Sequence, residues 1–378
     1  MLPKQHTSQR GITIRSLSHN LALCPASEME VLWISPFAVS PKRRLDVFNL
    51  LLLPWPLQLS SKDFEICLPA PLPIPEPFRV FRFARQGAGT DTKRLEEFLS
   101  NAIQRAQEQV KRVDAVVFPE LALTAQEYLI AERIAIQNDI MLIAGVNGQE
   151  GDQLGFSTPT NACFIQPFGL TLIPKEKKDW VATLRSHQSK HHRWFLDRSQ
   201  VIQYGLGGVL PASKTCWELT DVEQRRLNFV NLGSWLTLSV LICEDLARQD
   251  PVSEILRAVG PNLIIALLMD GPQLRSRWPS RYASVLADDP GSSVLTITSL
   301  GMAGRSRPAS SSEPDRSRTI ALWRDVRYGE REIELPKDHN ACVLSLVCET
   351  IEEYSADGRG DGGASHFPVF AGLHTFGV

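Results

Sequence analysis

The sequence contains no hydrophobic run long enough to cross a bilayer, and its charges nearly cancel. Its 40 lysines and arginines oppose 42 aspartates and glutamates, which leaves a formal net charge of −2. A membrane-spanning helix needs about 20 consecutive apolar residues, so we expect no membrane association. This balance of charge also gives no general reason to expect nucleic acid as a partner.

Cysteine is scarce and irregularly placed. The seven cysteines are an odd number, and none of them forms a Cys-x-x-Cys pair. This argues against a disulfide framework or a zinc ribbon, and we therefore predict a cytoplasmic protein in a reducing compartment.

Motifs that hold a cofactor are also missing. The sequence has no Walker phosphate loop and no dinucleotide fingerprint, so no cofactor is expected. It also has no Gly-x-Ser-x-Gly turn, which would hold a serine nucleophile. His187 and His191 are spaced for one helical face and stand beside His192, but no further ligands with suitable spacing accompany them. We therefore expect no metal.

Residues 46–350 alternate between strand and helix patterns, and 43% of the whole sequence is apolar, which is enough for a full core. This alternation predicts a layered α/β domain. The expected strands are Asp46–Leu53, Val113–Phe118, Ile140–Val146, Asn161–Gln166, Trp235–Ile242, Asn262–Met269, Val294–Thr298 and Ala341–Val347. The expected helices are Thr92–Arg112, Ala125–Asn138, Ser253–Val259 and Ser280–Ala287.

The flanking segments have weaker patterns. Residues 1–45 form an N-terminal extension in which only Val31–Ile34 could be a short strand. Leu68–Pro77 carries proline at alternate positions, which predicts an extended connector. Residues 351–378 are predicted to be a mobile C-terminal tail, because the Asp-Gly-Arg-Gly-Asp-Gly-Gly stretch lacks apolar residues.

Cys243 stands at the end of the strongest strand pattern and is followed by Glu244 and Asp245. A cysteine where a buried strand reaches the sheet edge is placed like a nucleophile in an α/β enzyme. Free cysteine is also a common core residue, so this position alone leaves both interpretations open.

Two other polar residues occupy comparable positions. Glu120 follows the strand Val113–Phe118, where partial burial would raise its pKa and suit it to act as a general base. Lys190 lies in the segment Ser189–Trp194, from which its charge could stabilise an oxyanion or lower the pKa of a thiol. An ordinary loop carboxylate and a solvated basic loop are the alternative interpretations.

In this order, Phe118-Pro119-Glu120, the His-rich segment at Lys190 and Leu241-Ile242-Cys243-Glu244-Asp245 resemble the motifs of the nitrilase, or carbon–nitrogen hydrolase, superfamily. The resemblance extends over about residues 46–349. It implies a four-layer α-β-β-α sandwich, a homo-oligomer, and hydrolysis of a small-molecule amide or nitrile through a thioester.

The resemblance also implies roles for individual residues. Glu120 would be the general base, Lys190 the oxyanion stabiliser and Cys243 the nucleophile, with the Glu244 backbone N–H as a second oxyanion donor. We expect Glu120→Gln and Lys190→Ala to abolish turnover without disturbing the fold. Lys175, Lys177 and Lys178 also lie between the two outer motifs and are alternatives to Lys190.

One departure from the family pattern leaves a second function open. Many members carry another glutamate shortly after the lysine, whereas here Asp197 is the available carboxylate. Either Asp197 replaces that glutamate or the role is missing. If it is missing, the chain could be a catalytically silent binding or regulatory module.

A narrower resemblance suggests where such a module would act. Lys-His-His-Arg-Trp-x-Leu-Asp, Gly-Pro-Asn-Leu and Ala-Asp-Asp-Pro-Gly-Ser-Ser are similar to segments of nitrilase-like domains attached to bacterial antiviral-defence reverse transcriptases. Nucleic acid would be a partner only within such a system.

Overall fold

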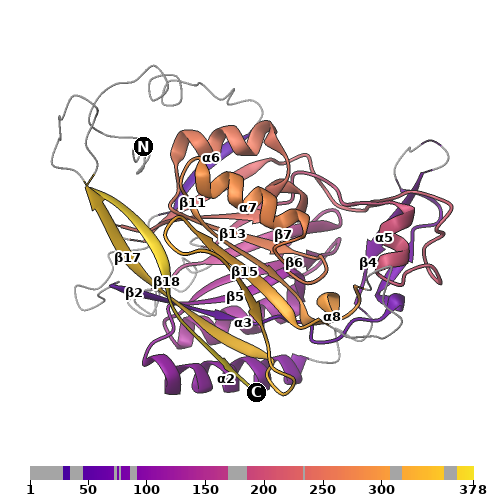
Figure 1. Cartoon of the computed structure of the whole chain (residues 1–378). Coiled ribbons are helices and arrows are strands. Elements are labelled where there is room, and N and C mark those ends of the chain that lie inside the picture. Colours follow the sequence, from indigo (N-terminus) through magenta and orange to yellow (C-terminus); the bar gives the residue numbers. More distant parts are fainter. Residues whose placement is uncertain are drawn as a thin grey trace.

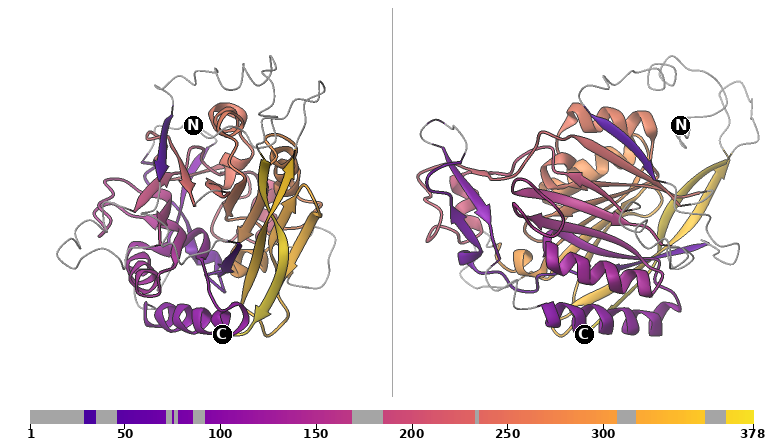
Figure 2. Two further views of the ribbon diagram at one scale, coloured as in Figure 1. Left: turned by 90° about the vertical axis from the view of Figure 1, so that its left-hand side faces the viewer. Right: turned by 180° about the vertical axis from the view of Figure 1, so that it is seen from behind.

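The computed structural model describes residues 29–34, 46–71, 75, 78–85, 92–168, 185–232, 235–306, 317–352 and 364–378. Two seven-stranded sheets lie face to face, and helices cover the outer face of each (Figures 1 and 2). The predicted α-β-β-α sandwich is therefore confirmed.

We name the two sheets after one strand of each, β5 and β12. The β5 sheet has the order β18 (Ala364–Phe376), β17 (Ala341–Glu352), β2 (Val47–Leu52), β5 (Ala115–Thr124), β6 (Met141–Gly148), β7 (Thr160–Gln166) and β8 (Ser186–Ser189). The β12 sheet has the order β1 (Glu30–Ile34), β11 (Arg226–Asn231), β12 (Thr237–Ile242), β13 (Leu263–Leu268), β14 (Ser293–Thr298), β15 (Thr319–Asp325) and β16 (Gly329–Glu334).

Side chains along each strand alternate between the space that separates the two sheets and the outer face that the helices cover. In β2, Phe48 and Leu50 pack between the two sheets, whereas Leu51 faces the helices α2 (Thr92–Val110) and α3 (Ala125–Gln137). In β12, Ile242 packs between the sheets. Its neighbour Leu241 packs on the opposite side, with the helices α6 (Glu254–Val259) and α7 (Trp278–Asp288). Successive side chains of a strand point to opposite faces, which is why strands covered on both sides are apolar throughout.

The two longer outer helices begin and pack as their sequences indicate. Helix α2 buries apolar residues at helical spacing, namely Leu95, Phe98, Leu99, Ala102, Ile103 and Ala106. Helix α3 starts with a capping box in which Thr124 and Glu127 each accept the other's backbone N–H.

A small accessory sheet projects from one side of the sandwich (Figure 1). Its strands are β3 (Phe64–Ile66), β4 (Arg79–Phe83), β10 (Cys216–Glu218) and β9 (Phe195–Leu196), and helix α5 (Arg198–Gln203) accompanies them. A hydrophobic cluster joins this sheet to Leu121 of β5 and to Met269, which follows β13. The sequence did not predict the accessory sheet, because strands of two to five residues carry too little periodicity.

Short helical turns complete the described chain. They are η1 (Ser61–Asp63), η4 (Cys243–Leu246), η5 (Gln249–Ser253) and α8 (Leu300–Ala303).

Two predictions about the flanks need correction. The tail was predicted to be mobile throughout, but Ala364–Phe376 forms β18 and pairs with β17 along its whole length. Phe367 and Val369 are buried there, so apolar residues beyond the glycine-rich stretch are enough for packing. Residue 46 is not the start of the domain either, because β1 pairs with β11 as a strand of the β12 sheet.

Some predictions fall outside the described residues. Residues 1–28, 35–45 and much of Leu68–Pro77 are among them. Within the described ranges, no helix is both long and apolar enough to span a membrane.

Candidate active site

Glu120 lies in an irregular part of β5, where the register with β6 shifts between Phe118 and Leu123. The following residue, Leu121, has a positive φ of 52°. Gly145 of β6 lies against this segment so closely that a Cβ there would stand 2.2 Å from the Pro119 carbonyl oxygen. The absence of a side chain at residue 145 therefore allows the irregular turn that presents Glu120.

Lys190 directly follows β8 and lies at Glu120, as the sequence suggested. Its Nζ is 2.8 Å from Glu120 Oε1 and 2.7 Å from Glu218 Oε2. The side chain is 0% exposed, and the Lys190 backbone N–H donates to the Asn161 carbonyl. The alternatives Lys175, Lys177 and Lys178 lie outside the described residues.

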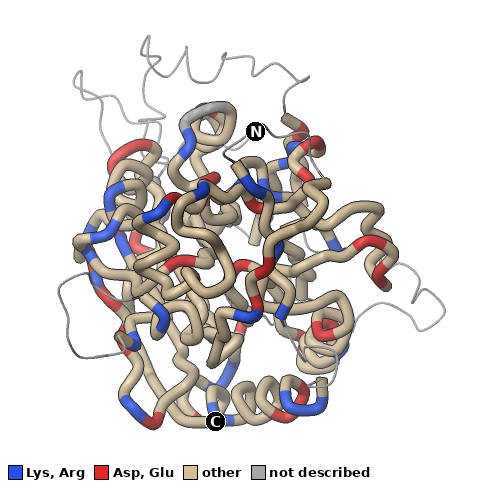
Figure 3. The backbone as a smooth tube through the Cα atoms, turned by 90° about the vertical axis from the view of Figure 1, so that its right-hand side faces the viewer, with Lys and Arg blue, Asp and Glu red and all other residues tan. Residues whose placement is uncertain are grey.

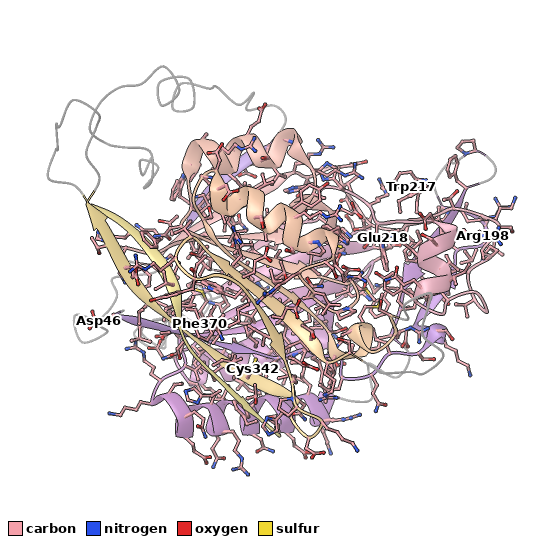
Figure 4. All side chains as sticks on the ribbon, viewed as in Figure 1. Asp46, Arg198, Trp217, Glu218, Cys342 and Phe370 are labelled. Carbon is pink, nitrogen blue, oxygen red and sulfur yellow. The ribbon has the colours of Figure 1, made fainter. Side chains whose placement is uncertain are left out.

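Glu218 is a site residue that the sequence did not reveal. It stands on β10 of the accessory sheet, 28 residues after Lys190 in the chain. Figure 4 places Glu218 and Trp217 on the sandwich side of the accessory sheet, with Arg198 further out. Its strand has only three residues, so no periodic pattern in the sequence marks Glu218 as a site residue.

Hydrogen bonds fix both carboxylates of the cluster. Asn161 Nδ2 bridges them, at 2.8 Å from Glu120 Oε1 and 2.7 Å from Glu218 Oε1. The backbone N–H of Met269 donates to Glu120 Oε2 at 2.5 Å, and that of Trp194 donates to Glu218 Oε2 at 2.9 Å. The carboxylates therefore have defined positions, which a general base requires.

The charges of the cluster shift the protonation of its members. Burial alone would lower the pKa of Lys190, but the carboxylates of Glu120 and Glu218 hold that pKa well above its ordinary value. Burial raises the pKa of Glu120; Lys190 opposes this shift and Glu218 adds to it. Lys190 therefore stays protonated, while Glu120 is moved toward the pKa range of a working base.

Cys243 directly follows β12 and begins the turn η4, with a positive φ of 45° and 3% exposure. The expectation that Lys190 lowers the pKa of this thiol is wrong in its net direction. Burial and the Glu120 carboxylate raise the pKa of Cys243 well above its ordinary value, although Lys190 opposes them. The Cys243 thiol is therefore neutral at rest, and a base would have to remove its proton before the sulfur could act as a nucleophile.

The other two residues proposed from the sequence have different outcomes. Asp197 does not replace the second glutamate, because it is exposed and caps helix α5 by accepting the Gln200 backbone N–H. Glu244 follows Cys243 in η4 and pairs with Arg248 at 3.6 Å. Its backbone N–H as an oxyanion donor remains a prediction.

Asp245 connects the turn that carries Cys243 to the segment that carries Lys190. It is 1% exposed and accepts the His191 backbone N–H at 3.1 Å on both oxygens. Its Oδ1 also lies 2.9 Å from His192 Nδ1. These histidines are therefore used in positioning, and no cluster of three or more metal-binding side chains occurs among the described residues.

Outside the site, acidic and basic residues are interspersed along the chain when it is viewed from the accessory-sheet side (Figure 3). This agrees with the small net charge of −2.

The chain was compared with known proteins. No family model and no curated protein matches the sequence. Among solved structures it is similar to a branch 10 nitrilase-superfamily protein from Saccharomyces cerevisiae, with a TM-score of 0.47 and 12% identity over 80% of this chain and 90% of that chain.

Two further solved structures are similar. One is a mutant of the amidase from Nesterenkonia, with a TM-score of 0.46 and 12% identity over 81% of this chain and 92% of that chain. The other is a carbon–nitrogen hydrolase superfamily protein from Xanthomonas campestris, with a TM-score of 0.44 and 10% identity over 79% of this chain and 89% of that chain.

Proposed function

We propose that this protein hydrolyses a non-peptide carbon–nitrogen bond, in an amide or a nitrile, with Cys243 as nucleophile. The observation that carries the proposal is the buried cluster of Glu120, Lys190 and Glu218, whose Glu120 and Lys190 charges both act on the Cys243 thiol. A fixed base and a fixed cation at one thiol are what acyl transfer through a thioester requires.

For an amide, the reaction begins when Glu120 takes the Cys243 proton and the sulfur attacks the carbonyl carbon. Lys190 and the Glu244 backbone N–H stabilise the oxyanion. The C–N bond then breaks, Glu120 returns its proton to the leaving amine, and a thioester remains. Glu120 next takes a proton from water, the resulting hydroxide attacks the thioester, and the acid leaves while the thiol is restored.

Glu218 supports this chemistry without attacking the substrate. Its Oε2 holds Lys190 Nζ at 2.7 Å, which orients the ammonium and keeps it charged. Its negative charge also raises the pKa of Glu120. The silent-module alternative rested on the absence of a second glutamate near Lys190. Because Glu218 contacts Lys190, that argument no longer favours the silent module.

Ammonia release from a panel of small amides and nitriles tests the proposal. The wild type should release ammonia, Cys243→Ala should not, and Cys163→Ala should match the wild type because Cys163 is a fully buried core thiol. Turnover that survives in Cys243→Ala would refute the proposal. If the wild type hydrolyses nothing and a defence function survives Cys243→Ala, the regulatory module is the better description.

We also propose a homo-oligomer in the cytoplasm. The six cysteines in the described residues are all free, as a reducing compartment favours. Light scattering at micromolar concentration should give a mass above the 42.2 kDa of one chain. A clean monomer mass would contradict the oligomer.

A further inference from the structure

Asp270 lies beside the proposed catalytic groups but has no part in the reaction described above. Strands β12 and β13 run parallel, with Ile242 opposite Leu267, so Cys243 and Asp270 emerge at the same sheet edge. The preceding residue, Met269, donates its backbone N–H to Glu120. The charge of Asp270 also contributes to the raised pKa of Cys243, which places its carboxylate at the same site.

One carboxylate oxygen of Asp270 is fully engaged. Oδ1 accepts the Tyr204 hydroxyl and the Arg277 guanidinium, the latter at 2.6 Å. Arg305 holds Tyr204 in turn by donating to its carbonyl at 2.8 Å, and the Thr298 hydroxyl donates to the Asp270 carbonyl at 2.6 Å. The carboxylate is therefore held in one orientation from several elements.

The other oxygen, Oδ2, has no hydrogen-bond partner among the described residues, although Asp270 is only 4% exposed. A buried carboxylate oxygen without a donor is costly, and such groups in native proteins need an explanation. Because Tyr204 and Arg277 fix the group, Oδ2 cannot simply turn to share their protons. A ligand that donates an N–H would complete its hydrogen bonding.

The charges around Cys243 indicate which donor is favoured. Four carboxylates act on the thiol or its cluster against three cationic side chains; the carboxylates are Glu120, Glu218, Glu244 and Asp270, and the cations are Lys190, Arg248 and Arg277. With all of these groups charged, the negative groups outnumber the positive ones. Such a site repels an anionic substrate and attracts a cationic one.

We propose that Asp270 Oδ2 binds a cationic N–H group of the substrate, so that the substrate is an amide or nitrile carrying a protonated amine or a guanidinium. This inference rests on the proposed function. Asp270 would then determine which substrate is bound, while Glu120, Lys190 and Cys243 perform the hydrolysis.

The first experiment measures kcat/KM for amides that differ in charge: β-alaninamide and argininamide are cationic, butyramide is neutral and succinamate is anionic. The wild type should prefer a cationic amide to butyramide, and Asp270→Asn should reduce that ratio about tenfold or more. The ratio within one variant is insensitive to partial unfolding. Asp325→Asn, which alters a buried and fully bonded carboxylate of β15, should leave the ratio unchanged.

The second experiment needs no turnover. Alkylation of Cys243, followed by peptide mapping, is compared for cationic bromoethylamine, neutral iodoacetamide and anionic iodoacetate, each relative to its rate with free glutathione. Sulfur displaces the halide in every case, so the comparison reports the charge of the site. The wild type should favour the cationic reagent, and Asp270→Asn should lose about tenfold of that preference.

The two experiments separate two kinds of failure. If no amide is hydrolysed but alkylation keeps the Asp270-dependent cation preference, the proposed function fails and the binding site stands. If Asp270→Asn leaves the alkylation preference unchanged, or if the wild type prefers butyramide or succinamate, the binding proposal is wrong.

Discussion

The sandwich and the accessory sheet hold their parts of the site in different ways. Glu120, Lys190 and Cys243 stand at irregular positions in or just after strands of the two seven-stranded sheets, whose facing side chains are buried. Glu218 stands on a three-residue strand of the accessory sheet, joined to the sandwich by one hydrophobic cluster. The difference teaches that the proposed reacting groups come from the two large sheets, whereas a carboxylate of the small accessory sheet adjusts their charge.

This comparison leads to separate expectations for the two regions. Substitutions in the sandwich should remove the reaction or the fold. Substitutions in the accessory sheet should instead change pH dependence and substrate preference. The following predictions run from the largest expected effect to the smallest.

The largest effect is expected for Lys190→Met, which differs from the sequence-based expectation that the fold is indifferent to Lys190. Removing the ammonium leaves Glu120 and Glu218 facing each other in a buried site without a counter-charge. We expect loss of turnover and a fall of about 3–5 kcal/mol in the free energy of unfolding. Denaturant titration measures the fall in the free energy of unfolding. Adding Glu218→Gln should recover part of the loss, and a double variant no more stable than the single one would contradict the ion-pair explanation.

Glu120→Gln should lower kcat by roughly 10²–10⁴-fold, because the base that accepts the thiol proton is gone. The fold should survive, since a glutamine can keep the Met269 hydrogen bond. The pKa of Cys243 should fall, because the Glu120 charge raises it, and the pH profile of alkylation reports that shift. As a control, Asp114→Asn changes a buried carboxylate just before β5 and should retain kcat.

Gly145→Ala tests whether the close approach of β6 sets the position of Glu120. The added Cβ would meet the Pro119 carbonyl oxygen at 2.2 Å and Glu120 Cα at 2.6 Å, so the backbone must shift. A displacement of about 1 Å can cost about 10²-fold in rate, and kcat/KM should fall by that order. Gly148→Ala is the matched control, because the three atoms nearest to its added Cβ all belong to the side chain of Phe156 and not to the backbone. Equal losses of activity in both variants would show that residue 145 has no special role.

The smallest effect is expected for Glu218→Gln, which is a change in pH dependence. Glu120 must be ionised to act as a base, so kcat/KM falls as the pH drops through the Glu120 pKa. Burial raises that pKa, and the Glu218 charge raises it further, so neutralising Glu218 should move the acid limb to lower pH. Glu223→Gln, on an exposed loop, should leave the limb in place. An acid limb that moves to higher pH in Glu218→Gln would mean that Glu218 acts on Glu120 in another way.

The sequence predicted the parts of the fold and site that follow long apolar patterns. The strands next to Cys243 and around Glu120 are buried on both faces, as their apolar composition predicted. Cys243 follows the end of its strand as expected, whereas Glu120 lies within β5, which continues to Thr124 and does not end at Phe118. Lys190 was found through its motif, and the structure brings its ammonium to Glu120.

The remaining parts could not be predicted because they depend on pairings between distant segments. Strand β10 has only three residues, and Glu218 comes to Lys190 only when β10 pairs with β4 and β9. The direction of the Cys243 pKa shift was wrong for a similar reason. Its sign follows from the depth of burial and from the net charge of the neighbours, neither of which is visible in a linear motif.

The pairing of β2 with β17 has a consequence for how the protein is made. Asn49 of β2 accepts a hydrogen bond from Ser345 of β17, a residue 296 positions later in the chain. During synthesis, β2 leaves the ribosome long before β17 exists. The backbone edge of β2 that pairs with β17 therefore stays unpaired until nearly 300 further residues have been made. Contacts of such long range fold slowly and expose strand edges to other chains. Slower translation or chaperone binding during synthesis should therefore affect the yield of folded protein more than the stability of the finished fold.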